Sequence, residues 1–512
     1  MSKKKDLNNY NMLFSASKEI QTLKGVSYML QWDQDTYMPF NAIDIRARQI
    51  ALLDTIIHEK QTNEFYTTIL KKMVNLKTGR VLATTLSAEK KSALKEWHRT
   101  YVKSTFLPKD FIEKFSILTS AGRHAWVVAR QENNFLEFKP YLERIVAMCR
   151  EKAELLKYQD HPYDALLDEY EPRWTTNEAE QLFSGLKEPL VNLLKLIAAK
   201  PKPNDGYLFG SFAKDKQLSF SKLLLEKMGF DLSCGRLDLS AHPSTIGLHP
   251  TDVRLTTAIH PSSLMSNIYS TIHEVGHGLY ELGLPKDLYG SPLCETISLG
   301  VHESQSRLWE AQLGHGLPFW QYFFPELKKE FPSVLETISL EQFYTAINKV
   351  IPGAIRTEAD EISYNLHIIL RFEIEKSLIE GTLAINDIPE AWNSKMQQYL
   401  NVKVKNNAEG CLQDIHWSMG AFGYFPTYTL GNLYAAQLFA TIKKQYPNWK
   451  NKVAQGSFMF IKEWLNTNIF RYGKRYSSQE LVKKATDNQL AVSCFIKYLY
   501  DKYKKIYKLE LV

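Results

Sequence analysis

The sequence predicts a large, mainly α-helical protein that contains one small β-sheet. The 24 glycines and 20 prolines make up about 9% of the 512 residues, against roughly 12% in an average protein, and this low content of helix breakers favours long helices. Hydrophobic residues account for 44% and charged residues for 23%, which is typical of a folded chain with a large core. No repeat or low-complexity linker divides the chain, so we expect a single domain over residues 1–512.

The predicted helices begin near residue 10 and continue as amphipathic stretches to about residue 200. The breaks between them contain prolines, at Pro39, Pro108, Pro162 and Pro172, and proline is disfavoured in helix interiors. Strand character is confined to about 236–260, where Val253, Leu255 and Ile259 alternate with Arg254 and Thr256, a pattern typical of a half-buried strand. Helical periodicity returns near residue 262 and continues to the C-terminus.

Charge and cysteine content exclude several classes of protein. A formal charge of +7 over 512 residues is too dilute to indicate a nucleic-acid-binding protein. The sequence has no uncharged apolar run long enough to span a membrane, and no apolar stretch follows the N-terminal lysines as it would in a secretory signal. The five cysteines are odd in number and form no CxxC pair, which is typical of reduced thiols. We therefore expect a cytoplasmic protein.

The segment His273-Glu274-Val275-Gly276-His277 is the clearest chemical motif. Two histidines four residues apart project from one face of a helix, about 6 Å apart, which suits two imidazoles that bind one tetrahedral zinc ion. Glu274 is then placed to take a proton from the zinc-bound water. The alternative is a helix with two hydrogen-bonded histidines and a solvated glutamate. Gly276 and Gly278 argue against it, because a helix tolerates such residues where another part of the chain passes close by.

A catalytic zinc needs a third protein ligand and an open fourth position. Two downstream glutamates compete for the role, Glu295 and Glu303. Glu303 lies on a predicted helix from about 298 to 313, where it could instead form an ion pair with Arg307 four residues later. Spacing alone leaves the choice open.

The sequence resembles the thermostable metallocarboxypeptidase family, also called the carboxypeptidase Taq family. His-Glu-x-x-His, followed after 24 residues by His302-Glu303-Ser-Gln, is that family's signature. Further blocks are similar to the family's in the same order from about residue 28 to 440: Trp32-Asp33 with Met38-Pro39, Tyr163–Asp168, Asp252-x-Arg254-x-Thr256, Ile355–Asp360, Gly410-x-x-Gln413-Asp414-x-His416-Trp417 and Gly423–Tyr428.

The resemblance implies a large helical zinc-peptidase fold with a deep substrate groove and a small sheet beside the zinc helix. It also implies a homodimer that removes single C-terminal residues from peptides with a free C-terminus, with Zn2+ as cofactor and Co2+ or Mn2+ as other candidates. It assigns the third ligand to Glu303. One block departs from the family: its His-Pro-Phe is His242-Pro243-Ser244 here. The histidine is retained, but the packing beside it must differ.

A carboxypeptidase needs a cation for the substrate carboxylate and donors for the oxyanion. We expect Arg356 to supply the cation, since a guanidinium fork suits a carboxylate. Arg356 is predicted to begin a helix whose polar stripe continues through Asp360, Ser363, His367 and Arg371. For the last two we expect a solvated stripe closed by salt bridges. Further candidates for substrate binding are His242, Arg254, His416, Tyr424 and Tyr428.

Arg254 and Thr256 share one face of a predicted edge strand that could bind extended peptide, although Arg254 could equally form a structural ion pair. The 410–428 segment is predicted to be a glycine-containing loop that brings His416 and two tyrosines to the oxyanion, although its aromatic residues could equally belong to the core.

The predicted reaction is hydrolysis by zinc-activated water with Glu274 as the base. The alternatives are another zinc exopeptidase or an oligoendopeptidase of the same motif class, and, from a different class, a non-catalytic peptide-binding protein with a structural zinc. The sequence leaves open the preferred C-terminal residue, the native metal, the physiological substrate and the dimer interface.

Overall fold

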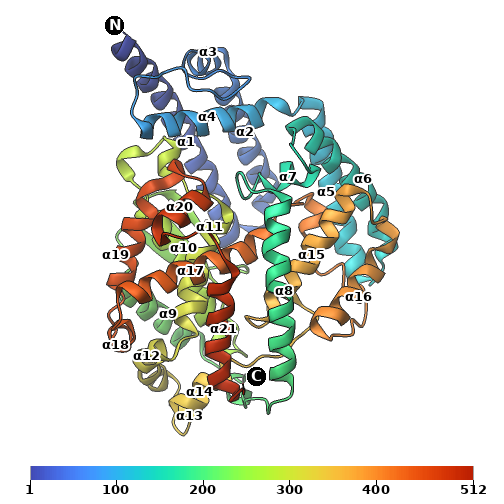
Figure 1. Cartoon of the computed structure of the whole chain (residues 1–512), viewed down its shortest axis with the longest axis vertical. Helices are drawn as coiled ribbons and strands as arrows, with labels where there is room; N and C mark the ends of the chain where they lie inside the picture. The colour runs from blue at the N-terminus through green and yellow to red at the C-terminus, as the bar shows by residue number, and fades with distance from the viewer. Residues whose placement is uncertain (1, 511–512) are drawn as a thin grey trace.

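The computed structural model describes residues 2–510, and the chain is predominantly helical, as predicted (Figure 1). The N-terminal helices are α1 (Ser2–Thr36), α2 (Ile43–Thr62), α3 (Glu64–Met73) and α4 (Ala88–Phe106). Their buried side chains form a small hydrophobic cluster that also includes Leu293. The predicted break at Pro39 separates α1 from α2, because Pro39 precedes a 3-10 turn that redirects the chain.

The next helices are α5 (Lys109–Gln131), α6 (Phe135–Leu156), α7 (Pro162–Leu167), α8 (Thr176–Ala198) and α9 (Lys214–Met228). The other predicted breaks are confirmed. Pro108 directly precedes α5, Pro162 is the first residue of α7, and Pro172 lies in the turn before α8. Proline suits the start of a helix because its missing N–H would be unpaired there in any case.

The sheet lies within the segment that showed strand character. It comprises β1 (Gly235–Leu239), β2 (Ser244–His249) and β3 (Asp252–Thr257) in the order β1-β3-β2. Strand β1 is parallel to β3, and β2 is antiparallel to it. The prediction that β3 is an edge strand is therefore wrong, because both of its edges are paired. Val253 and Leu255 are fully buried, and the sheet packs against helix α10 (Leu264–Gly283).

The remaining helices follow α10 in the chain. They are α11 (Leu299–Arg307), α12 (Leu317–Glu330), α13 (Pro332–Leu335), α14 (Leu340–Ala346), α15 (Ser363–Glu380), α16 (Ile388–Leu400), α17 (Pro426–Gln445), α18 (Trp449–Ala454), α19 (Met459–Asn468), α20 (Ser478–Thr486) and α21 (Val492–Tyr507). Buried side chains between Leu118 and Leu509 in the sequence form one continuous hydrophobic core. Within this core, α11 packs against both α10 and α17 (Figure 1). Among residues 2–510, no helix has the length and apolar character needed to cross a membrane.

The helix predicted to begin at Arg356 begins at Ser363 instead. Arg356–Glu358 form a separate 3-10 turn. The Asp360 carboxylate accepts hydrogen bonds from the backbone N–H groups of Ile362 and Ser363, at 3.0 and 2.9 Å. Because an aspartate that pairs the free N–H groups of a helix start stabilises that start, the sequence around Asp360 begins α15 rather than continuing an earlier helix.

His367 and Arg371 were predicted to lie on a solvated stripe closed by salt bridges. The predicted exposure to solvent is wrong, whereas the salt bridge is confirmed for Arg371. Both side chains are fully buried. His367 Nε2 lies 3.1 Å from the carbonyl oxygen of Gly353, and Arg371 Nη2 lies 2.6 Å from the Asp414 carboxylate. Helical periodicity shows which residues share a face, but the residue that pairs with a charge on that face comes from a distant part of the chain.

Candidate active site

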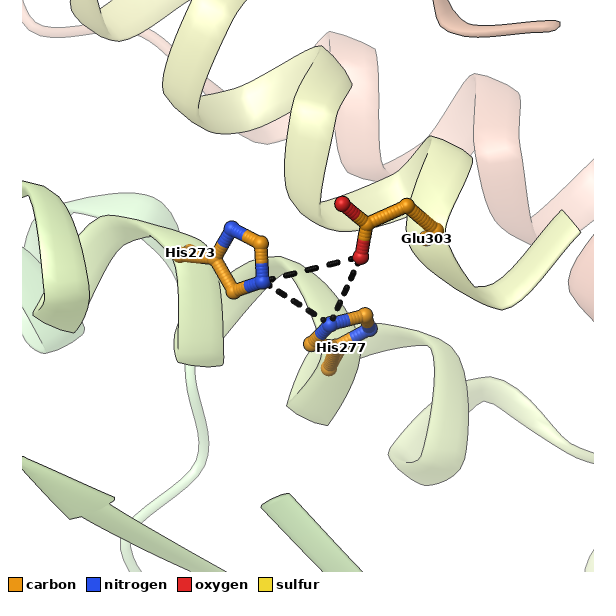
Figure 2. A group of neighbouring side chains, drawn as sticks. All are labelled: His273, His277 and Glu303. Carbon is orange, nitrogen blue, oxygen red and sulfur yellow. Dashed lines mark hydrogen bonds and ion pairs between the residues drawn. The ribbon is translucent and has the colours of Figure 1, made fainter. Parts of the chain in front are cut away.

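Helix α10 presents two histidines to a third residue from α11. The Nε2 atoms of His273 and His277 lie 3.2 Å apart, and Glu303 Oε2 lies 3.7 and 3.6 Å from them (Figure 2). Around a tetrahedral ion with bonds of about 2.1 Å, ligand atoms are about 3.4 Å apart. Two imidazole nitrogens and one carboxylate oxygen at this spacing fit a divalent ion with borderline character, such as Zn2+.

The close packing of three helices places Glu303. A Cβ at Gly276 of α10 would lie 2.6 Å from Ser306 Cα, and a Cβ at Gly431 of α17 would lie 2.6 Å from Glu303 Cγ. Both distances are too short for real contacts, so these positions must lack a side chain for α10, α11 and α17 to approach. Gly278, the other glycine of the motif, faces the side chains of Phe230 and Leu255. The predicted close approach is thus confirmed, and at Gly276 the neighbour is the helix that carries Glu303.

The carboxylate of Glu310, which the sequence analysis did not identify as a site residue, fixes the orientation of His273. Glu310 Oε2 lies 2.8 Å from His273 Nδ1, so this nitrogen can donate to the carboxylate while Nε2 faces Glu303. Burial raises the pKa of Glu310, but the charges of Arg307 and His273 outweigh it and lower that pKa to about 2. Glu310 lies in a π-helical turn, Leu308–Gly314, whose register no sequence pattern revealed.

Arg307 pairs with Glu310 and not with Glu303. Its Nη1 donates to Glu310 Oε2 at 2.8 Å, and its Nε donates to Asn432 Oδ1 at 2.8 Å. The alternative explanation of Glu303 as the partner of Arg307 is therefore not supported by the contacts. Glu295, the competing third ligand, lies 2.5 Å from Lys474 Nζ in an ion pair and is not part of the histidine cluster.

Glu274, which belongs to the His273–His277 motif of α10, contacts strand β2 of the sheet. Its side chain is only 6% exposed, and Thr245 of β2 donates to its Oε2 at 2.6 Å. Burial raises the pKa of the Glu274 carboxyl, partly offset by the charge of His273. A carboxylate beside the histidine cluster with a raised pKa is suited to accept a proton.

A second charged cluster centres on Asp414. Its Oδ1 accepts from Nη2 and Nε of Arg356, at 2.7 and 3.0 Å, and its Oδ2 lies 2.6 Å from Arg371 Nη2. Two guanidinium groups therefore share one carboxylate, which leaves an excess of positive charge. Arg356 also donates from Nη1 to the Tyr364 hydroxyl at 3.1 Å, so its fork is held in one orientation.

The residues of the predicted 410–428 loop adjoin this charged cluster, but the loop ends where α17 begins at Pro426, so that Tyr428 lies in the first turn of that helix. The His416 ring packs at a tilt against Phe425 and edge-on against Tyr424, with ring centroids 4.4 and 5.1 Å apart. Its Nε2 lies 3.5 Å from the Tyr428 hydroxyl. Burial lowers the pKa of His416 to about 4, so the ring is neutral at neutral pH. Burial raises the pKa of Tyr424, and the charge of Glu303 raises it further.

Two predicted substrate-binding residues have other surroundings. Arg254 forms an ion pair with Asp252 at 3.0 Å, and its guanidinium lies over Trp32, 4.4 Å from the ring centroid, which favours the structural alternative. His242 is exposed in the turn between β1 and β2, and among residues 2–510 its side chain has no hydrogen bond to the histidine cluster. Ser244, in place of the family's phenylalanine, lies 3.1 Å from the Thr256 hydroxyl.

Comparison with known proteins identifies the family of this chain. A sequence model described as carboxypeptidase Taq (M32) metallopeptidase matches residues 12–503. Thermostable carboxypeptidase 1 of Thermus thermophilus is 38% identical, covering 97% of this chain and 99% of that protein. Carboxypeptidase 1 of Bacillus subtilis is 36% identical, covering 97% and 98%. The crystal structure of an M32 carboxypeptidase from Deinococcus radiodurans has a TM-score of 0.94 at 34% identity, covering 98% of this chain and 100% of that one. The chain therefore belongs to the carboxypeptidase Taq (M32) family of metallopeptidases.

Proposed function

We propose that this protein is a zinc-dependent carboxypeptidase that releases single amino acids from the free C-terminus of peptides. The observation that carries the proposal is the set of three donor atoms, from His273, His277 and Glu303, with mutual distances of 3.2 to 3.7 Å. A zinc ion held there would polarise the scissile carbonyl group and acidify water.

Glu274 is the proposed base. Its carboxylate takes a proton from the attacking water and passes it to the leaving amino group, so that the peptide C–N bond breaks and the base is restored. Thr245, which donates to Glu274 Oε2 at 2.6 Å, orients the carboxylate. The other oxygen of Glu274 remains available to the water.

We assign recognition of the substrate carboxylate to the cluster around Arg356. The excess positive charge shared by Arg356, Arg371 and Asp414 favours a bound anion. His416, Tyr424 and Tyr428 line the same region and would donate hydrogen bonds to the peptide or the oxyanion. Arg254 and His242 remain weaker candidates for contacts further along the peptide.

The test is to incubate a peptide pool with the enzyme, with and without a chelator, and to follow the products by mass spectrometry. We expect products shortened one residue at a time from the C-terminal end, none after chelation, and none from C-terminally amidated versions of the same peptides. The Glu274→Gln variant serves as the matched inactive control. Internal cleavage, or equal hydrolysis of amidated peptides, would instead indicate an oligoendopeptidase.

We further propose a cytoplasmic homodimer. All five cysteines are free thiols, which suits a reducing compartment, and the dimer follows from the family resemblance. Light scattering of the purified protein should give twice the 59.2 kDa mass of the chain; a mass equal to one chain would contradict the dimer.

A further inference from the structure

A carboxylate with no cationic partner lies beneath the loop that carries the proposed substrate-binding residues. Glu375 of α15 is fully buried. Its Oε1 accepts from Trp417 Nε1 at 2.9 Å, and its Oε2 accepts from the Gly423 backbone N–H at 3.0 Å and from the Tyr163 hydroxyl at 2.6 Å. Three donors thus converge on one side chain, and two of them belong to the loop.

The positions of the two loop donors are informative. Trp417 directly follows His416, and Gly423 directly precedes Tyr424. The Glu375 carboxylate therefore joins the two ends of the turn 417–423, and the residues just outside these ends are the two whose rings pack together, with centroids 5.1 Å apart. Cutting either hydrogen bond frees one end of the turn and changes the placement of His416 relative to Tyr424.

Close backbone packing holds the same turn from the other side. Gly423 has φ +91°, and a Cβ at this position would lie 2.7 Å from the backbone of Leu166 in α7. Helix α7 also carries Tyr163, the third donor to Glu375. The turn is therefore clamped between α7 and the Glu375 carboxylate of α15, which leaves it little freedom to move independently of either helix.

The charge of Glu375 is unusual for a residue with only a structural role. No lysine, arginine or histidine nitrogen within residues 2–510 forms an ion pair with it, and the nearby Arg371 already pairs with Asp414. Burial raises the pKa of Glu375 to about 7, although its three hydrogen bonds and the charge of Arg371 act in the opposite direction. The other titratable groups that face Glu375 are Tyr163, Tyr170 and Cys149. An unpaired buried carboxylate is costly, whereas a neutral residue would fill the same space at a lower cost.

We infer that Glu375 is a positioning residue for substrate binding: its carboxylate fixes the 417–423 turn and thereby sets His416 and Tyr424 against the Arg356–Asp414 cluster. The inference rests on the proposed function, in which His416 and Tyr424 contact the peptide.

The test compares three variants that each disturb the same hydrogen-bonded group. Glu375→Gln replaces one accepting oxygen by an amide nitrogen, Trp417→Phe removes a donor that belongs to the loop, and Tyr163→Phe removes a donor that does not. We expect Glu375→Gln and Trp417→Phe to lower kcat/KM roughly 10- to 100-fold, mainly through KM, because small displacements of binding groups have effects of this size. Tyr163→Phe should stay within about threefold of the wild type, since it leaves both tethers of the loop in place.

Zinc affinity, measured by chelator competition, and the thermal unfolding temperature are determined for each variant. Values of kcat are expressed per folded, zinc-loaded molecule. A purely structural role of Glu375 would leave KM unchanged. If Glu375→Gln and Trp417→Phe have the same KM as Tyr163→Phe, the inference is overturned.

His416→Ala and Tyr424→Phe are measured in parallel to separate the inference from the function on which it rests. If both retain the wild-type kcat/KM, the proposed role of the loop in substrate binding is wrong, and the inference falls with it. If both lose activity while Glu375→Gln does not, the proposed function stands and only the inference is overturned.

Discussion

Substitution of Gly431 by alanine tests whether helix packing places Glu303, the proposed third metal ligand. The new Cβ would lie 2.6 Å from Glu303 Cγ and 2.8 Å from Glu303 Cβ, whereas ordinary contacts begin at 3.4 Å. Relief of the closer contact requires a displacement of about 0.8 Å. Both atoms are near the backbone of α11, so Glu303 cannot move away by rotation of a flexible end, and its carboxylate must shift.

A shift of this size exceeds the tolerance of a metal site, in which ligand distances vary by about 0.2 Å. We therefore expect Gly431→Ala to weaken zinc binding roughly 10- to 100-fold, equivalent to about 1.4–2.7 kcal/mol. Alanine is intrinsically favoured over glycine in a helix by about 1 kcal/mol, so loss of helix propensity would not explain a loss of metal.

The assay is competition for zinc against a fluorescent chelator of known affinity. Gly185→Ala is a matched control, because Gly185 also lies within a long helix, α8, and its Cβ would meet only Val492 Cγ2, at an ordinary 3.7 Å. We expect this control to bind zinc as the wild type does. A folded Gly431→Ala protein with the affinity of the Gly185→Ala control would refute the reasoning, because Glu303 would then not depend on the contact with α17.

The remaining predictions concern four other side chains. Glu274→Gln should retain one zinc per chain and lose roughly 10²–10⁴-fold in kcat; a rate near that of the wild type would show that another group is the base. Glu310→Gln should weaken zinc binding about 10-fold or more, because an amide accepts less strongly from His273 Nδ1, and the same chelator competition would reveal unchanged affinity as a contrary result. Arg356→Lys should raise KM for free peptides more than it lowers kcat, since a lysine lacks the fork that meets a carboxylate; a selective fall in kcat would contradict its role in binding. For Glu375, the pKa raised to about 7 means that the folded state binds a proton more tightly than the unfolded state. The contribution of Glu375 to the free energy of unfolding is therefore complete below about pH 4.3 and is lost as the pH rises through 7. The unfolding temperature of the wild type minus that of Glu375→Gln should accordingly be larger at pH 5 than at pH 8, and a difference that grows with pH would contradict this sign.

Several features of the site were accessible from the sequence because their geometry is local. The spacing of His273 and His277 determines that both imidazoles leave one face of a helix, whatever surrounds it. The low content of glycine and proline likewise indicated a helical protein, and the prolines marked where helices begin. The spacing did not distinguish Glu303 from Glu295 as the candidate third metal ligand. Only the family resemblance favoured Glu303.

The errors arose where a residue's partner is distant in the sequence. Arg371 was expected in solvent, but it pairs with Asp414 across 43 residues, and Arg356 pairs with the same carboxylate across 58. The edge-strand prediction for β3 failed for a similar reason, since the pattern of a single strand does not reveal how many neighbours pair with it.

By itself, the sequence of this protein determined the helical class, the faces of its helices and the presence of a two-histidine motif, because these depend on the repeat of the backbone and on residues within a few positions of one another. Only the tertiary structure decided that Glu310 orients His273, that Gly431 makes room for Glu303, and that Glu375 joins both ends of the turn 417–423. These relations depend on which helices lie in contact and at what distance. Such contacts result from packing the whole core, in which side chains hundreds of residues apart compete for the same space.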